Sequence, residues 1–354
     1  MTLEPDSSYE WPIQSNILRN IDGEDSSNNE EFKIHVFIPD SFQGPPLSKS
    51  NPEADKNSKP KKKPLPHHIM IMVNGLAEYN SAVYLGKNGF CELFRQIGIA
   101  TVFLPLPFHF NRLSDEDQQA LAVEIEKKKA GDKTRFKHPD VEKLLSDPLR
   151  FYLGYEQIRE DIEYVTERID DSIQSGKLPP DTKISLWGFS IGGLGILSAF
   201  MENPKKYDAC VLVHSGANFK TLGFNKDILT EKQWENLRKE MLELPVEEWP
   251  LHGRTNIRRK EYELFRMLFV GEQDEMLKNA ISDCSNKLLI FIGEEDDVNS
   301  LASVISTLRP TKGLAMHTLP GLRHDNVNKA FRRWVNYEVR VIKAFLDFHP
   351  SLAT

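Results

Sequence analysis

The sequence predicts an α/β protein in which a mostly parallel central sheet is covered by helices on both faces. Short apolar runs alternate with helical patterns along most of the 354 residues. The runs are almost continuously apolar, as strands are when both faces of a parallel sheet are buried. One of them, Lys183–Ser190, leads through a glycine-bounded turn straight into a helical pattern.

Seven segments have the composition of strands, since they are rich in β-branched and other apolar residues and most end at turn signals. In chain order they are Phe32–Pro39, His67–Gly75, Ile99–Pro107, Lys183–Ser190, Ala209–Ser215, Lys287–Gly293 and Leu314–Gly321. The first two are expected to be neighbouring strands. Residues 41–66 connect them and consist largely of Pro, Lys, Ser and Asn. Because this stretch has little to bury, we expect a flexible, solvated loop.

Helical patterns fill the intervals between these strands. Shorter helices are expected at Ala82–Gln96, on the surface between Ser114 and Pro148, and at Gly193–Met201. A longer helix is predicted by apolar residues that recur at steps of three and four. These residues are Tyr155, Ile158, Ile162, Val165, Ile169 and Ile173. Pro179 and Pro180 are expected to end that helix. A terminal amphipathic helix places Trp334, Val341, Ile342 and Phe345 on its apolar side.

Residues 219–285 interrupt the alternation of strands and helices. Thr230 and Gln233 form a capping-box signature at the start of one helical pattern. Residues 258–269 have a second helical pattern, and no strand is expected between the two. We therefore predict a helical lid at 219–285, inserted into a core made of residues 1–218 and 286–354.

The composition excludes several classes of protein. With 52 acidic and 45 basic residues, the net charge of −7 disfavours binding to nucleic acid. No apolar run approaches the length that spans a bilayer. The first residues lack the basic and apolar regions of a secretory signal, so a cytoplasmic location is expected. Cys91, Cys210 and Cys284 are too few and too scattered for a disulfide framework and are expected to be reduced.

The sharpest local signal is Gly188-Phe189-Ser190-Ile191-Gly192, a G-x-S-x-G placed after a predicted strand and before a predicted helix. A nucleophile on such a tight turn stands clear of the sheet, and small residues two positions away on either side avoid a collision. The amides at the start of the following helix point toward the charge that develops during attack. This context favours Ser190 as a nucleophile.

A serine hydroxyl needs a base, and the base needs an acid that orients it. Asp296 lies three residues beyond the glycine that ends one later strand, and His324 follows the next strand. All three residues therefore fall at the carboxyl edge of the predicted sheet, where open α/β sheets bind ligands. Glu295 and Asp297 compete with Asp296 for the role of the acid.

The chain resembles the α/β-hydrolase superfamily from about Phe32 to its end, most specifically in WGFSIGG, FIGEEDDV and LPGLRHD. Within it, the sequence looks most like small bacterial hydrolases of unassigned substrate. The resemblance implies the α/β-hydrolase fold with a lid, Ser190 as nucleophile, Asp296 as orienting acid and His324 as base. It also implies an oxyanion hole built from the backbone N–H groups of Ile191 and Leu76.

Further residues are expected near the substrate. The family usually has His-Gly before the second oxyanion donor, and Asn74 replaces that histidine here. Asn74, His109 and Arg112 are therefore candidates for substrate contact. His214, at the end of a predicted strand, is expected to be structural. The adjacent His67 and His68 lack partners at the spacing of a metal site.

The function predicted is that of a serine hydrolase acting on a carboxylic ester or related small acyl substrate. No nucleotide motif is present, so neither a cofactor nor a metal is expected. A thioesterase, amidase, lactonase or acyltransferase would use the same three residues. The same fold also serves catalytically silent binding proteins, and lyases or cofactor-free oxygenases that make no use of the nucleophile. The sequence does not indicate an oligomeric state.

Overall fold

A computed structural model gives the fold. It describes residues 8–14, 31–39, 67–75, 82–107, 109, 112–132, 148–217, 230–243, 274–308, 314–324 and 327–348. The loop predicted at 41–66 lies outside these residues.

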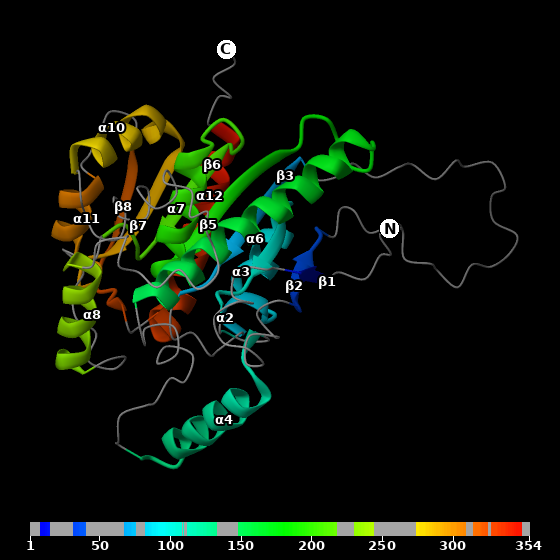
Figure 1. Cartoon of the computed structure of the whole chain (residues 1–354). Coiled ribbons are helices and arrows are strands. Elements are labelled where there is room, and N and C mark those ends of the chain that lie inside the picture. Colours follow the sequence, from blue (N-terminus) through cyan, green and yellow to red (C-terminus); the bar gives the residue numbers. More distant parts are fainter. Residues whose placement is uncertain are drawn as a thin grey trace, which may run out of the picture.

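Eight strands form one sheet. They are β1 (Ser8–Gln14), β2 (Glu31–Phe37), β3 (His68–Val73), β4 (Ala100–Leu104), β5 (Lys183–Phe189), β6 (Ala209–Val213), β7 (Leu288–Gly293) and β8 (Ala315–Leu319). Their order across the sheet is β1-β2-β4-β3-β5-β6-β7-β8 (Figure 1). The strands from β3 to β8 are parallel, and the β1–β2 ribbon joins antiparallel at the β4 edge. The mostly parallel sheet predicted from the sequence is confirmed.

The expectation that β2 and β3 are neighbours is wrong, because β4 lies between them. His35 of β2 faces Phe103 of β4, while Ile71 of β3 faces Val102 of β4. A parallel neighbour has to be reached by a crossover through a helix, and the chain makes that crossover directly after β3. β4 then occupies one edge of β3 and β5 occupies the other, so β2 can pair only beyond β4.

Helices cover both faces of the sheet (Figure 1). They are α2 (Ala82–Leu85), α3 (Phe90–Gln96), α4 (Asp115–Lys129), α6 (Pro148–Gln174), α7 (Ile191–Glu202), α8 (Glu231–Glu243), α10 (Asp274–Cys284), α11 (Leu301–Leu308) and α12 (Val327–Phe348). Helices α6, α7, α10 and α11 share one apolar core with the sheet, whereas α2, α3 and α12 share the other. In both figures α4 projects away from these layers.

Alternation within the strands explains why two cores form. Ile69, Ile71 and Val73 of β3 belong to the core under α6 and α7. Met70 and Met72, between them in sequence, belong to the core under α3 and α12. Successive side chains of a strand point to opposite faces, so an almost continuously apolar strand is needed when both faces are covered.

Two helices differ in extent from the prediction. The pattern at Ala82–Gln96 divides into α2 and α3, because the chain turns sharply before Gly89. A Cβ on Gly89 would lie 2.6 Å from the carbonyl oxygen of Tyr84. The long helix α6 ends at Gln174, before the two prolines expected to end it. Gly176 has a φ of +70° and donates its N–H to the Ile173 carbonyl, a glycine stop that needs no proline.

The sequence patterns missed β1 and α11. β1 contains Pro12 and lies at the edge of the sheet, a position that tolerates proline. A proline within a short apolar run argues against a strand when only the sequence is known, so β1 was not predicted. In the predicted lid, α8 and α10 lie within 219–285, and the remainder is outside the described residues apart from Thr230 and Ser285. Thr230 and Gln233 do form the predicted capping box, with the Gln233 N–H donating to Thr230 Oγ1 at 3.2 Å.

The remaining expectations concern cysteines and membranes. Cys91, Cys210 and Cys284 are all buried and form no disulfide. Burial raises the pKa of the Cys91 thiol to about 12, so this thiol stays protonated and packs as an apolar group. None of the helices described is long and apolar enough to cross a membrane.

Glu338 on α12 offers a test of the core. Its side chain is 4% exposed, and burial raises its pKa to about 8. The folded protein therefore holds this proton more tightly than the unfolded chain does, and the free energy of unfolding falls as pH rises from about 4.5 to about 8. Glu338→Gln should match the wild type near pH 4.5 and be more stable by about 2–4 kcal/mol above pH 8.

Urea unfolding at the two pH values measures this difference. Glu116→Gln, at an exposed position of α4, is the control and should change stability equally little at both. A gain from Glu338→Gln that does not depend on pH would contradict the buried, protonated carboxyl.

Candidate active site

Ser190 stands on a strained turn between β5 and α7. Its φ and ψ are +52° and −123°. Residues with a side chain rarely adopt this backbone conformation, which costs on the order of 1–3 kcal/mol. The Ser190 N–H donates to the Val213 carbonyl at the end of β6, at 2.9 Å. The strand on one side, the helix on the other and this hydrogen bond to a neighbouring strand together hold the turn.

The glycines around Ser190 are required by close backbone contacts. A Cβ on Gly188 would lie 2.7 Å from the carbonyl oxygen of Gly192, across the turn. A Cβ on Gly192 would collide with the carbonyl oxygen of Asn74, in the loop after β3. The first glycine of the G-x-S-x-G therefore makes room for the turn itself, and the second makes room for the neighbouring loop.

Ser190, His324 and Asp296 form a continuous hydrogen-bonded chain. Ser190 Oγ lies 3.0 Å from His324 Nε2, and His324 Nδ1 lies 3.0 Å from Asp296 Oδ2. Ser190 lies in the turn after β5, Asp296 in the loop after β7 and His324 in the turn after β8. The structure thus brings together the three residues that the sequence placed at one edge of the sheet.

The acid that reaches His324 is Asp296 rather than either neighbour. Asp296 is buried, whereas Glu295 and Asp297 are exposed. Asp297 instead accepts a hydrogen bond from Arg323 at the surface, at 3.2 Å. Asp296 Oδ1 accepts the backbone N–H groups of Val298 and Asn299, at 3.0 and 2.7 Å. Those two bonds orient the carboxylate so that Oδ2 faces the histidine.

A second histidine shares the same oxygen. His214 Nδ1 lies 2.7 Å from Asp296 Oδ2. Burial alone would raise the pKa of Asp296, but hydrogen bonds from His214 and His324 outweigh it and hold that pKa well below its usual range. Asp296 is therefore an ionised acceptor, and the Nδ1 atoms of both histidines carry the protons that they donate.

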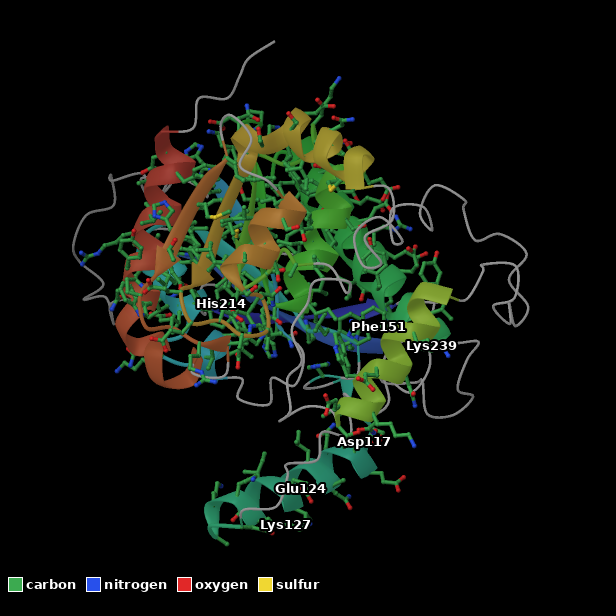
Figure 2. The ribbon with its side chains drawn as sticks, turned by 90° about the vertical axis from the view of Figure 1, so that its left-hand side faces the viewer. Asp117, Glu124, Lys127, Phe151, His214 and Lys239 are labelled. Carbon is green, nitrogen blue, oxygen red and sulfur yellow. The ribbon has the colours of Figure 1, made fainter. Side chains whose placement is uncertain are left out.

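His214 was expected to be structural, and its position next to Asp296 was missed. It follows β6, the strand between those that lead to Ser190 and Asp296, and Figure 2 shows it at that end of the sheet. The signal was present in the sequence: a histidine at the carboxyl end of the intervening strand has to lie on the same edge. Its φ of +48° directs the ring away from the line of the strand.

Of the two expected oxyanion donors, only Ile191 is among the described residues. Ile191 is the first residue of α7, so its N–H has no acceptor within that helix. Leu76 lies outside the described residues. The residue before it, Gly75, is close to the turn: a Cβ there would lie 2.5 Å from the Phe189 ring and 3.2 Å from Ser190 Cβ. The loop that leads to Leu76 therefore passes directly beside Ser190.

The three candidates for substrate contact are all fully buried. Asn74 Oδ1 accepts the Leu106 N–H at 2.8 Å, and its Nδ2 donates to the Gly75 carbonyl. This side chain joins the loops after β3 and β4. His109 Nδ1 lies 2.9 Å from the Pro107 carbonyl, within its own turn.

Arg112 lies in the core rather than at the surface. Its Nη1 donates to the Pro105 carbonyl and to Asp161 Oδ2, both at 2.9 Å, and its guanidinium lies 3.9 Å from the centre of the Phe32 ring. The ion pair with Asp161 is almost completely buried, at 0% and 2% exposure. Arg112 therefore ties the loop after β4 to α6 and β2.

Donor atoms of His214, Asp296 and His324 lie within 4.8 Å of one another. Two imidazoles and a carboxylate have the chemistry of a zinc site. The measured separations, however, are those of N–H···O hydrogen bonds, and two backbone amides occupy the other carboxylate oxygen. We therefore assign this cluster as a hydrogen-bonded network.

A small apolar hollow of about 10 Å³ lies beside the turn. It is enclosed by the loop after β4, by α6 and by the first residue of α7. The lining residues are Leu106, Pro107, Phe151, Gly154, Tyr155, Ile158 and Ile191. This volume is about what one water molecule needs, so the hollow admits only a very small group unless its lining moves.

Solved structures of the same architecture include hydrolases. An S-formylglutathione hydrolase from Agrobacterium tumefaciens has a TM-score of 0.53 and 14% identity, over 98% of this chain and 97% of that one. A highly thermostable carboxyl esterase from Bacillus coagulans, in complex with glycerol, has a TM-score of 0.51 and 14% identity, over 96% of this chain and 99% of that one. At such identities these likenesses show the fold, which is that of the α/β-hydrolase superfamily.

The family is given by the sequence itself. Residues 58–317, well over half of the chain, match the Family of unknown function (DUF6051), and the chain belongs to this family. A search of curated proteins gave no match.

Arg112 can be tested as a structural residue. Arg112→Met leaves the Asp161 carboxylate buried without its cation, which should lower the free energy of unfolding by about 3–5 kcal/mol. Adding Asp161→Asn removes the stranded charge and should restore more than half of that loss. Arg323→Met breaks an exposed pair with Asp297 and is the control, with little expected effect.

Urea unfolding of the single and double variants measures the coupling. A substrate-binding Arg112 would instead raise KM in a variant as stable as the wild type, and that result would contradict the structural role.

Proposed function

We propose that the protein is a serine hydrolase that cleaves a carboxylic ester or related acyl substrate. The observation that carries this proposal is the hydrogen-bonded chain from Ser190 Oγ through His324 to Asp296, with both separations at 3.0 Å. Because the ionised Asp296 only accepts hydrogen bonds, the proton of a neutral His324 is on Nδ1. Nε2 is then the acceptor that faces the serine hydroxyl.

The chemistry follows from this arrangement. Ser190 Oγ attacks the acyl carbon as His324 Nε2 takes its proton, and a tetrahedral oxyanion forms. When the intermediate collapses, the bond to the leaving group breaks and His324 returns the proton to that group. The acyl-enzyme is then hydrolysed when His324 activates a water molecule in the same way. Asp296 stabilises the imidazolium in both half-reactions.

The oxyanion needs preorganised donors. We assign this role to the backbone N–H groups of Ile191 and Leu76. The first is at the start of α7, where the helix dipole favours negative charge, and the position of Gly75 beside Ser190 supports the second. Neither donor depends on the side chain at Asn74.

The acyl side of the substrate is assigned to the apolar hollow beside Ile191. Its small volume and its apolar lining favour a short, uncharged acyl chain. Two structural neighbours, a carboxyl esterase and an S-formylglutathione hydrolase, support the choice of acyl chemistry. A thioester would be cleaved by the same three residues.

The nucleophile can be tested with a fluorophosphonate probe and p-nitrophenyl esters. Wild-type protein should be labelled, and Ser190→Ala should abolish labelling. Ser190→Ala or His324→Ala should lower kcat/KM by about 10⁴- to 10⁶-fold, since either removes the unit that transfers the proton. Ser175→Ala, in an exposed turn after α6, is the control.

If folded wild-type protein is neither labelled nor active, the proposal is wrong, and a catalytically silent binding function is favoured. Turnover that survives Ser190→Ala would instead indicate a mechanism without a serine nucleophile.

The acyl pocket predicts a chain-length preference. Among p-nitrophenyl esters from acetate to decanoate, kcat/KM should be highest for the short chains. Ile158→Ala enlarges the hollow, so the preference should move to longer chains, by about fourfold for each methylene that becomes buried. Ile158→Val is the intermediate control. A preference unchanged by Ile158→Ala in folded protein would place the acyl chain elsewhere.

A further inference from the structure

We propose that His214 is a positioning residue of this site: a neutral imidazole that donates from Nδ1 to Asp296 Oδ2 and divides the charge of that carboxylate with His324. The hydrogen-bond network stands on the geometry alone. Its kinetic consequence rests on the proposed function.

The first support is the shared oxygen. Asp296 Oδ2 lies 2.7 Å from His214 Nδ1 and 3.0 Å from His324 Nδ1, and the bond to His214 is the shorter of the two. With the two backbone amides on Oδ1, the carboxylate accepts four hydrogen bonds. An acid that served His324 alone would not need a second imidazole on the same oxygen.

The second support is the backbone. Ser190 and His214 are the two non-glycine residues with positive φ in the part of the chain that the structure describes. Both lie at this site, and backbone strain of this kind concentrates at functional positions. Space is also reserved for the ring, since a Cβ on Gly293, at the end of β7, would lie 2.9 Å from His214 Cε1.

The third support is the state of the ring. His214 is 1% exposed, and Nε2 has no hydrogen-bond partner among the described residues. A buried nitrogen without a hydrogen bond costs free energy of desolvation, and an apolar ring of the same size would fill the space without that cost. Packing alone therefore does not explain a histidine here. A second proton on Nε2 would place a charge where none of the described residues accepts it. Burial accordingly lowers the pKa of His214, so the ring remains a fixed, neutral donor.

Few other charges lie near the two histidines in the described part of the chain. The Phe189 ring lies 5.6 Å from the His214 ring and 5.8 Å from the His324 ring, and forms an apolar wall beside both. Among the described residues of the adjoining loops, the ionisable groups are Glu294, Glu295, Asp297 and Arg323, none of which is buried. Ser190 faces His324 from the start of α7. Variants at His214 leave all of these groups unchanged.

The consequence concerns the protonated state of the base. A carboxylate that already serves His214 stabilises a positive charge on His324 less than an undivided carboxylate would. We therefore expect the site to stay active to lower pH than it would with an undivided carboxylate. Without the His214 donor, the full charge of Asp296 would stabilise the imidazolium form of His324 more strongly.

The pH dependence of kcat/KM tests this consequence. In His214→Phe, which keeps an aromatic ring and lacks the donor, the acid limb should move to higher pH by about one unit. At the wild-type midpoint of that limb, kcat/KM should fall about fivefold, with KM little changed. His214→Asn retains a donor at the Nδ1 position and tolerates positive φ, so it should restore the wild-type limb.

His317→Phe is the matched control, because this histidine lies on β8 and its Nδ1 is bonded to Tyr337. Its acid limb should coincide with that of the wild type. A folded His214→Phe variant with an unchanged limb, or a His214→Asn variant that shifts as far as His214→Phe, would overturn the proposal.

A second measurement requires neither activity nor a variant that folds. In ¹⁵N NMR of the wild type, the His214 ring should be protonated on Nδ1 alone at pH 7. A ring protonated on Nε2, or on both nitrogens at pH 7, would overturn the proposal even if Ser190 proved to be the nucleophile. Conversely, the predicted tautomer would stand even if no ester were cleaved.

Discussion

The carboxylate of Asp296 accepts four hydrogen bonds, and the arrangement of the site depends on them. Two come from the backbone of its own loop and two from histidines that follow β6 and β8. Burial of a charge is costly unless it is fully paired, so the ends of three strands have to meet at this point. The position of His324, and through it the contact with Ser190, follows from satisfying one buried charge.

Close backbone approach is the second constraint. Gly192 lies against the loop after β3, and Gly293 against both the His214 ring and the Leu322 carbonyl before His324. Buried polar groups hold the loops that approach: Asn74 bonds the loop after β4, and Arg112 ties that loop to Asp161 of α6. These buried groups therefore fix the distance between the strand ends that carry the site.

Sequence reasoning predicted the class of fold, the parallel strands and the three residues that meet, because each depends on local patterns and on the rule that parallel strands end at one edge. It could not predict the order of β2, β4 and β3, which depends on long-range pairing. It named Asn74, His109 and Arg112 as candidates for substrate contact but could not show that all three are fully buried, because burial depends on how distant segments pack. His214 was recoverable, but only by asking what lies between the strands of Ser190 and Asp296.

The position of β4 between β3 and β2 also bears on synthesis. β2 has a sheet partner in β1, but its other edge stays open until residue 104 has left the ribosome. More than sixty residues of chain separate the two, and during that interval an apolar strand edge is available to other chains. The β1–β2 ribbon therefore joins the rest of the sheet only after β4 has been made.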